Sequence, residues 1–148
     1  MPTAEVGVRG RTRGLLIQAL YQWQLTGHSV AELENQFRER AEFARIDREF
    51  FEELLRDVFK QRDELDAIVA RLADRPREQL DPVELAVIYL GLVELSRHLE
   101  TPYRVVLNEA VRLARSFGAE DGHKYVNALL DRAAAELRAA EYRAGRQH

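Results

Sequence analysis

Three arginines stand close together near the start of the chain: Arg9, Arg11 and Arg13. Fixed guanidinium charges at this spacing, with no acidic residue among them, suit contact with a phosphate backbone. The competing interpretation is a solvated, solubilising end of the chain, and charge spacing alone favours that interpretation.

A second polar group begins the last helical pattern of the sequence: Asp121, His123, Lys124 and Tyr125. Free backbone N–H groups and the positive end of the helix dipole favour an anionic phosphate at such a position. Lys124 adds positive charge, and the ring of Tyr125 could stack on an unpaired base. Asp121 is most simply explained as a helix N-cap, and Tyr125 is equally well explained as a partly buried aromatic residue.

The sequence predicts no metal site, no cofactor and no enzymatic activity. His123 beside Glu120 and Asp121 matches no standard ligand spacing. Cysteine is absent, and so are the glycine-rich phosphate loop and the GxSxG and HExxH motifs of common enzyme classes. The acidic run between Glu49 and Glu53 fits the solvated face of a helix and not a catalytic carboxylate pair.

Length and composition predict a single soluble domain. The 148 residues carry a net charge of -3, which argues against a general nucleic-acid coat but permits a local basic patch. No run approaches the roughly 20 apolar residues of a membrane-spanning helix. Because nothing indicates an oxidising compartment or a membrane, we expect the protein in the cytoplasm.

The elements that must position these residues are predicted to be helices. Apolar residues recur at helical spacing, and no segment alternates with a period of two. The predicted stretches are 9–25, 29–37, 48–72, 82–95, 102–117 and 121–137. The third stretch contains neither glycine nor proline, so it is either one long helix or two. We therefore expect an all-α, compact helical bundle of six or seven helices.

Local signals mark the ends of these helices. Gly27 suits a left-handed C-cap, and Ser29 with Glu32 forms a capping box. Asp47 and Asp81 are predicted N-caps.

The pattern breaks at 75–77, which divides the chain into helical halves of about 9–75 and 76–138. Both halves are rich in apolar positions, so we expect two subdomains that share one core within a single domain, 1–148. The ends, including the tail after Glu136, are predicted to fray. Three aromatic residues of the apolar stripes are predicted to lie in the core: Trp23, Tyr89 and Tyr103.

Three parts of the sequence, read together, resemble the NusB family. They are the segment 18–25 (QALYQWQL), Pro102-Tyr103 with 108–110 (NEA), and 116–121 (SFGAED) with 123–127 (HKYVN). Their order and spacing match the family from about Arg9 to Leu137. The resemblance implies a fold of two three-helix units. It also implies binding of the boxA sequence of nascent RNA together with a small-subunit ribosomal protein, NusE, so that RNA polymerase reads through terminators in ribosomal RNA operons.

The resemblance also implies roles for individual residues. The RNA contacts that it implies are Arg9, Arg11, Arg13, Asp121, His123, Lys124 and Tyr125. The contacts that it implies with the ribosomal protein are Tyr21, Glu78 and Glu84, and two acids suit a basic partner. Glu84 is also explained as a first-turn acid that opposes the helix dipole.

Further expected partners are the transcription elongation complex and a second copy of the chain, because family members occur as monomers and as homodimers. The alternative function is a helical protein-interaction module that does not bind RNA. The net negative charge fits this alternative.

Overall fold

Helices account for all regular structure in residues 7–146, the part of the chain that the computed structural model describes. The eight α-helices and two 3-10 helices are α1 (Val8–Thr26), α2 (Val30–Arg38), η1 (Ala41–Arg45), α3 (Arg48–Lys60), α4 (Arg62–Leu72), η2 (Arg77–Gln79), α5 (Pro82–Arg97), α6 (Tyr103–Phe117), α7 (Gly122–Leu137) and α8 (Ala139–Arg146). The all-α prediction is thereby confirmed. None of these helices is both long enough and apolar enough to cross a membrane.

Most of the predicted caps are present. The Ser29 hydroxyl accepts the Glu32 N–H at 3.2 Å, while the Glu32 carboxylate accepts the Ser29 N–H at 2.8 Å. Gly27 ends α1 with a φ of 71°, the left-handed conformation that glycine adopts without strain. Asp47 and Asp81 cap α3 and α5 through their carboxylates.

The helix count exceeds the prediction for two reasons. The stretch 48–72 is divided at Gln61, so that α3 packs on α1 and α5 while α4 contacts α7. The predicted fraying of the tail is wrong up to Arg146, because α8 is held by tertiary contacts. The Glu141 carboxylate accepts the Tyr103 N–H at 2.8 Å, and the Tyr142 ring lies 5.3 Å from that of Tyr103.

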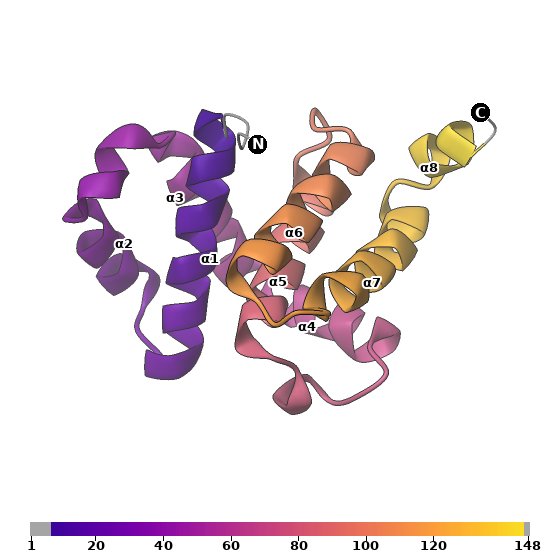
Figure 1. The fold of residues 1–148 in the computed structure, drawn as a ribbon, viewed down its shortest axis with the longest axis horizontal. Coiled ribbons are helices and arrows are strands. Elements are labelled where there is room, and N and C mark those ends of the chain that lie inside the picture. The colour runs from indigo at the N-terminus through magenta and orange to yellow at the C-terminus, as the bar shows by residue number, and fades with distance from the viewer. Residues whose placement is uncertain (1–6, 147–148) are drawn as a thin grey trace.

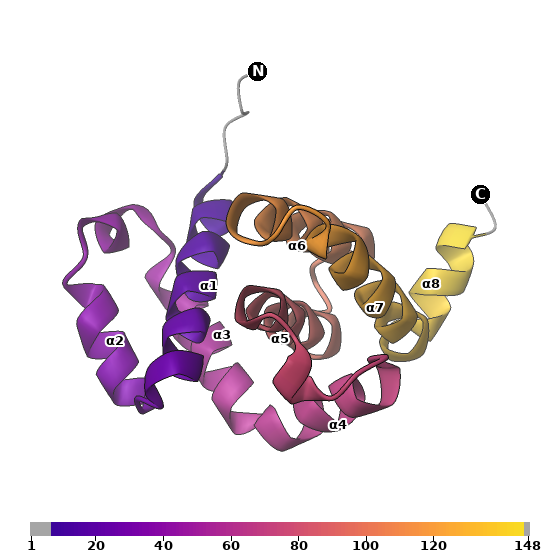
Figure 2. The ribbon, with the colours of Figure 1, turned by 60° about the horizontal axis from the view of Figure 1, so that its bottom comes forward.

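Helix α5 lies at the centre of the molecule. Every residue from Glu84 to Leu95 is buried, as expected of a helix that is apolar on all sides. Figure 1 shows α1, α2 and α3 to one side of the fold and α6 and α7 to the other. In Figure 2 the helices α1, α3, α4, α6 and α7 enclose α5, and α8 lies at the outer edge.

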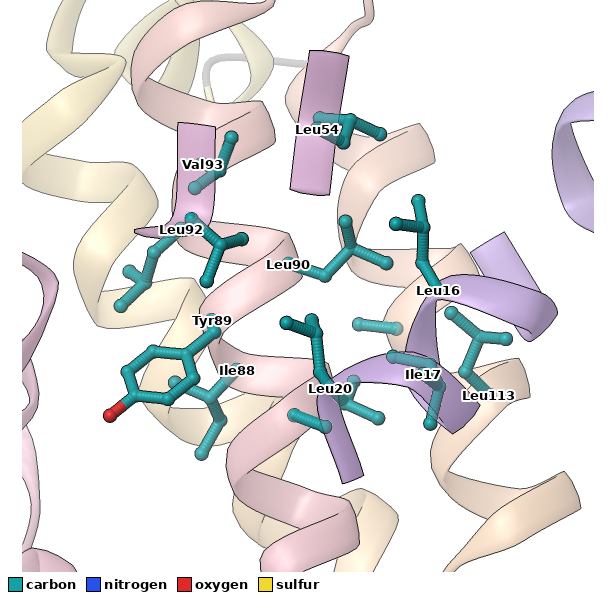
Figure 3. Packing of buried hydrophobic residues seen from close by; sticks show 14 of the residues in the cluster. Leu16, Ile17, Leu20, Leu54, Ile88, Tyr89, Leu90, Leu92, Val93 and Leu113 are labelled. Atoms are coloured by element: carbon teal, nitrogen blue, oxygen red, sulfur yellow. The ribbon is translucent and has the colours of Figure 1, made fainter. Parts of the chain in front are cut away.

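One apolar core joins the two halves of the chain. Figure 3 shows α5 side chains, including Leu90, packed against Leu16 and Leu20 of α1 and Leu113 of α6. Tyr89 is fully buried, its hydroxyl donates to Asp66, and burial raises its pKa to about 12. The core positions predicted for the other two aromatic residues also agree with the structure, Tyr103 being buried and Trp23 partly buried.

Candidate nucleic-acid interface

Two of the predicted arginines are exposed on the first turns of α1. The Arg9 side chain is 49% exposed, with its guanidinium 4.1 Å from the centre of the Phe50 ring and 4.0 Å from the Asp47 carboxylate. Arg11 is also exposed, and its Nε donates to the Arg45 carbonyl at 3.1 Å. Both cations can therefore face a ligand in solution.

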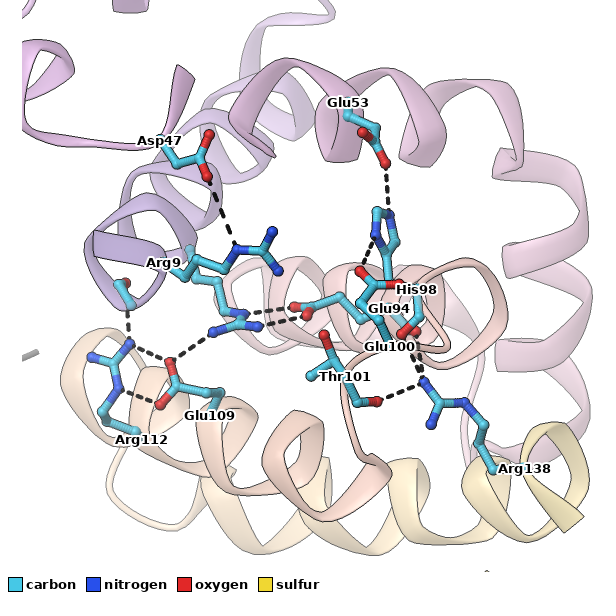
Figure 4. Close-up of polar contacts among 12 residues, drawn as sticks. Arg9, Asp47, Glu53, Glu94, His98, Glu100, Thr101, Glu109, Arg112 and Arg138 are labelled. Atoms are coloured by element: carbon cyan, nitrogen blue, oxygen red, sulfur yellow. Dashed lines mark hydrogen bonds and ion pairs between the residues drawn. The ribbon is translucent and has the colours of Figure 1, made fainter. Parts of the chain in front are cut away.

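Arg13 does not share that environment. Its side chain is 6% exposed and makes two 2.8 Å hydrogen bonds to Glu94, with Glu109 3.3 Å away. Burial acts to lower the pKa of Arg13, but the hydrogen bonds to Glu94 raise it overall, so the guanidinium stays charged. Figure 4 shows the Glu94 and Glu109 carboxylates converging on one guanidinium group. The structure therefore corrects the prediction of an RNA contact for Arg13, whose cation is neutralised inside the protein.

A groove of about 350 Å³ lies between α1, η1 and α6. Three arginines line it: Arg11, Arg45 and Arg112. The Phe117 side chain, 39% exposed, and the acidic residue Glu42 line it as well. Arg112 is anchored by a 3.1 Å hydrogen bond to the Gly10 carbonyl and by its contacts with Glu109. Cations beside an exposed aromatic ring are suited to a single-stranded nucleic acid.

The start of α7 carries exposed charges of both signs. The Lys124 side chain is 74% exposed, and its Nζ lies 3.5 Å from the Asp121 carboxylate. Asp121 occupies the N-cap position but makes no capping hydrogen bond, which corrects that prediction. The half-buried His123 places Nε2 3.5 Å from a guanidinium nitrogen of Arg115.

Tyr125 faces another part of the molecule. The Arg75 guanidinium lies 4.7 Å from the centre of its ring. The hydroxyl is buried and has no hydrogen-bond partner among the described residues, and burial raises its pKa. A stacking base would have to use the other face of the ring or displace Arg75.

Helix α6 connects the two predicted groups. Arg112 reaches the backbone of α1, and one helical turn later Arg115 reaches His123 at the start of α7. Residues three apart on a helix share a face. We call this region the basic surface and define it as Arg11, Arg45, Arg112, Arg115 and Lys124.

The predicted partner residues Tyr21 and Glu78 lie near the C-terminal end of α1. Tyr21, 39% exposed, lines one depression of about 510 Å³, and Glu78 lines a second of about 550 Å³. Leu25 is 62% exposed and lines both depressions. The Glu78 side chain is 74% exposed. Apolar side chains and an accessible acid therefore share this face, which we call the α1-end surface: Tyr21, Leu25 and Glu78.

Glu84 lies apart from that surface. It is 9% exposed and packs against the start of α7, where a Cβ atom on Gly122 would lie 2.2 Å from a Glu84 carboxylate oxygen. Burial, and then the charge of Asp81, raise the pKa of Glu84. This burial argues against the predicted partner contact of Glu84, because α7 covers most of its carboxylate.

Comparison with known proteins decides the family. A model of the NusB family matches residues 10–135. The chain belongs to the NusB family. It is 48% identical over 129 residues to the transcription antitermination protein NusB of Nitrosospira multiformis, across 87% of this chain and 82% of that protein. It is 44% identical over 136 residues to the protein of the same name from Pseudomonas savastanoi pv. phaseolicola, across 92% of this chain and 82% of that protein.

A solved structure supports the same assignment. The structure of T. maritima NusB superposes with a TM-score of 0.76 at 26% identity, covering 88% of this chain and 93% of that one. The resemblance read from the sequence motifs is thereby confirmed. The relatives carry the name of a transcription factor, which agrees with the prediction of a non-enzymatic protein.

Within the region that matches the NusB family, the structure adds three arginines to the predicted group: Arg45, Arg112 and Arg115. The i,i+3 spacing of Arg112 and Arg115 on one predicted helix was an available signal for a shared basic face. Arg45 had no such signal, because only the packing of η1 beside α1 brings it to the groove.

Proposed function

We propose that this NusB-family protein is a transcription antitermination factor. It binds a boxA-type single-stranded RNA together with the small-subunit ribosomal protein NusE, and acts in the cytoplasm as part of the transcription elongation complex. The relatives that carry the name transcription antitermination protein support this proposal. The observation that carries it is the basic surface, a local concentration of cations on a chain whose net charge is -3.

The chemistry of the basic surface fits RNA. Arginine presents planar donors that match phosphate oxygens, and a row of cations binds a backbone irrespective of sequence. Phe117 offers an exposed ring in the same groove, and a base stacked on an aromatic ring gains roughly 1–3 kcal/mol. Arg9, Asp121 and His123 remain proposed contacts at the margins of this surface. Tyr125 remains a proposed contact through the face of its ring that Arg75 does not cover.

Replacing Arg11 and Lys124 together by alanine should weaken RNA binding and reduce its dependence on salt. Each lost phosphate contact on a single strand lowers the slope of log K against log salt concentration by about 0.7, so the double variant should lose about 1.4. Fluorescence anisotropy of a labelled boxA-like RNA at several salt concentrations measures both effects.

Arg143→Ala is the matched control for this experiment, because Arg143 is an exposed cation on α8, at the far edge of the fold (Figure 2). Its salt slope should equal that of the unmodified protein. A double variant that keeps the original slope would exclude the basic surface from RNA binding.

We propose that the α1-end surface binds the ribosomal protein. Tyr21 provides a half-exposed aromatic side chain beside Leu25, and such residues commonly dominate interface energies. Glu78 provides the charge that a basic partner requires. Tyr21→Ala should weaken the partner complex by about 2 kcal/mol.

Glu78→Lys should slow association with the ribosomal protein, most strongly at low salt. Titration calorimetry with the purified partner measures the affinity, and stopped-flow mixing measures the association rate. Glu49→Lys reverses the charge of an exposed acid on α3 and should leave both the affinity and the association rate unchanged. Equal effects of Glu78→Lys and Glu49→Lys would indicate general charge attraction and no specific contact.

A further inference from the structure

A cluster of ionisable side chains joins α3 to the end of α5, away from the basic surface. His98, the C-cap residue of α5, is 4% exposed. Its Nε2 lies 3.5 Å from Glu53 Oε2 and 3.4 Å from Asp57 Oδ2. Glu53 and Asp57 are one turn apart on α3, and the three potential ligand atoms all lie within 4.8 Å of one another.

The other side of the imidazole ring is held in place. Nδ1 lies 3.3 Å from the Glu100 carboxylate, and the Phe50 ring packs edge-on against the imidazole at 6.0 Å. Figure 4 shows the His98 ring between Glu53 and Glu100. A carboxylate accepts hydrogen bonds, so in this contact the imidazole Nδ1 is the donor.

This arrangement leaves Nε2 without a hydrogen bond. The atom is buried, and no hydrogen-bond partner is found for it in the described part of the chain. In a neutral ring protonated at Nδ1, the unprotonated Nε2 lies close to two carboxylate oxygens, and that contact is repulsive. A cation between the three atoms removes the repulsion, either as a proton on Nε2 or as a metal ion.

The distances from His98 Nε2 to the two carboxylates fit a metal ion. Zinc bonds to imidazole nitrogen and to carboxylate oxygen are close to 2.1 Å, so neighbouring ligand atoms of a tetrahedral site are about 3.4 Å apart. The observed separations from Nε2 are 3.4 and 3.5 Å. A metal-bound histidine commonly donates its second N–H to a carboxylate, as His98 does to Glu100.

We propose that Glu53, Asp57 and His98 bind a divalent transition-metal ion such as Zn²⁺, with Glu100 orienting the imidazole and water completing the coordination. An imidazole ligand selects zinc and its first-row neighbours over Mg²⁺, which takes oxygen ligands. The Glu53 and Asp57 side chains are 61% and 26% exposed, so an ion can enter from solvent. Bound metal would link the N-terminal half of the chain to the C-terminal half.

No sequence pattern indicates this site, because His98 is distant from Glu53 and Asp57 along the chain. The acidic positions alone fit a solvated helix face, as predicted. Only the packing of α3 against α5 brings the three ligands together.

Titration calorimetry of the full-length, untagged protein with Zn²⁺ tests the proposal. We expect saturable binding of one ion per chain, and Mg²⁺ should not compete. Asp57→Asn and His98→Gln should each weaken zinc binding by at least the roughly 10- to 100-fold that is typical of losing an outer-shell partner. Asp57 is partly exposed, so Asp57→Asn keeps the test valid if His98→Gln fails to fold. Glu64→Gln, at an exposed acid on α4, should bind zinc like the unmodified protein.

Nitrogen NMR of the histidine rings gives a second readout. Zinc should shift the Nε2 resonance of His98, assigned by its loss in His98→Gln, and leave Nδ1 protonated. Three results would overturn the proposal: no saturable zinc binding, zinc binding that Asp57→Asn and His98→Gln leave unchanged, or a His98 ring that stays protonated on both nitrogens when zinc is added.

Discussion

Replacing Arg13 by alanine is expected to lower the free energy of unfolding by about 3–5 kcal/mol, because it leaves the buried Glu94 carboxylate without its cation. The Glu94 side chain is 2% exposed, so its carboxylate is cut off from bulk water. Glu109 keeps its contact with Arg112 and contributes less to the loss. Urea denaturation followed by circular dichroism measures the change.

The double variant Arg13→Met/Glu94→Leu separates loss of the ion pair from loss of packing. A buried ion pair replaced by apolar residues of similar volume is often neutral or stabilising, so the double variant should regain most of the stability lost in Arg13→Ala. Per folded molecule, Arg13→Ala should also bind RNA with an unchanged salt slope. A reduced slope would restore Arg13 to the RNA contacts.

Replacing Arg138 by alanine is expected to cost about 3 kcal/mol of unfolding free energy, since buried acceptors that lose a charged donor are left unsatisfied. The Arg138 side chain is 4% exposed and donates to four backbone carbonyls near the end of α5, those of Glu94, Leu95, His98 and Thr101, at 2.7–3.2 Å. The Glu94 and His98 carbonyls also accept the backbone N–H groups of His98 and Thr101, so the Leu95 and Thr101 carbonyls depend most on Arg138. Figure 4 shows Arg138 reaching the turn at Thr101.

Two further variants serve as controls for Arg138→Ala. Arg138→Lys should recover only part of the loss, because an ammonium group cannot reproduce the planar set of donors. Arg143→Ala, at an exposed position of α8, should change stability by less than about 0.5 kcal/mol. Equal denaturation midpoints for Arg138→Ala and Arg143→Ala would contradict a structural role for the buried guanidinium.

Features that depend on nearby residues were predictable from the sequence. The capping box at Ser29, the left-handed Gly27 and the caps at Asp47 and Asp81 are all present as expected. The sequence does not decide whether 48–72 is divided at Gln61, and it does not predict α8. Both depend on contacts with distant segments, such as the hydrogen bond from Tyr103 to Glu141.

The candidate site was harder to predict because burial changes within one turn of a helix. Arg9 and Arg13 are four residues apart on α1, yet only Arg13 reaches Glu94 in the core. The i,i+3 and i,i+7 spacing of Arg13 to Leu16 and Leu20 was an available signal for its inward position. Likewise, the apolar residues on all sides of α5 could have indicated that Glu84 is buried.

Binding of a labelled boxA-like RNA and a scrambled control, with and without the ribosomal protein partner, tests the proposed function most directly. The measurement is fluorescence anisotropy at near-physiological salt, since affinities for nucleic acid depend strongly on salt concentration. We expect selective binding of the boxA-like RNA that tightens when the ribosomal protein is added. Equal binding of the two RNAs, or no binding of either, with and without the partner, would contradict the proposed function and favour a protein-interaction module.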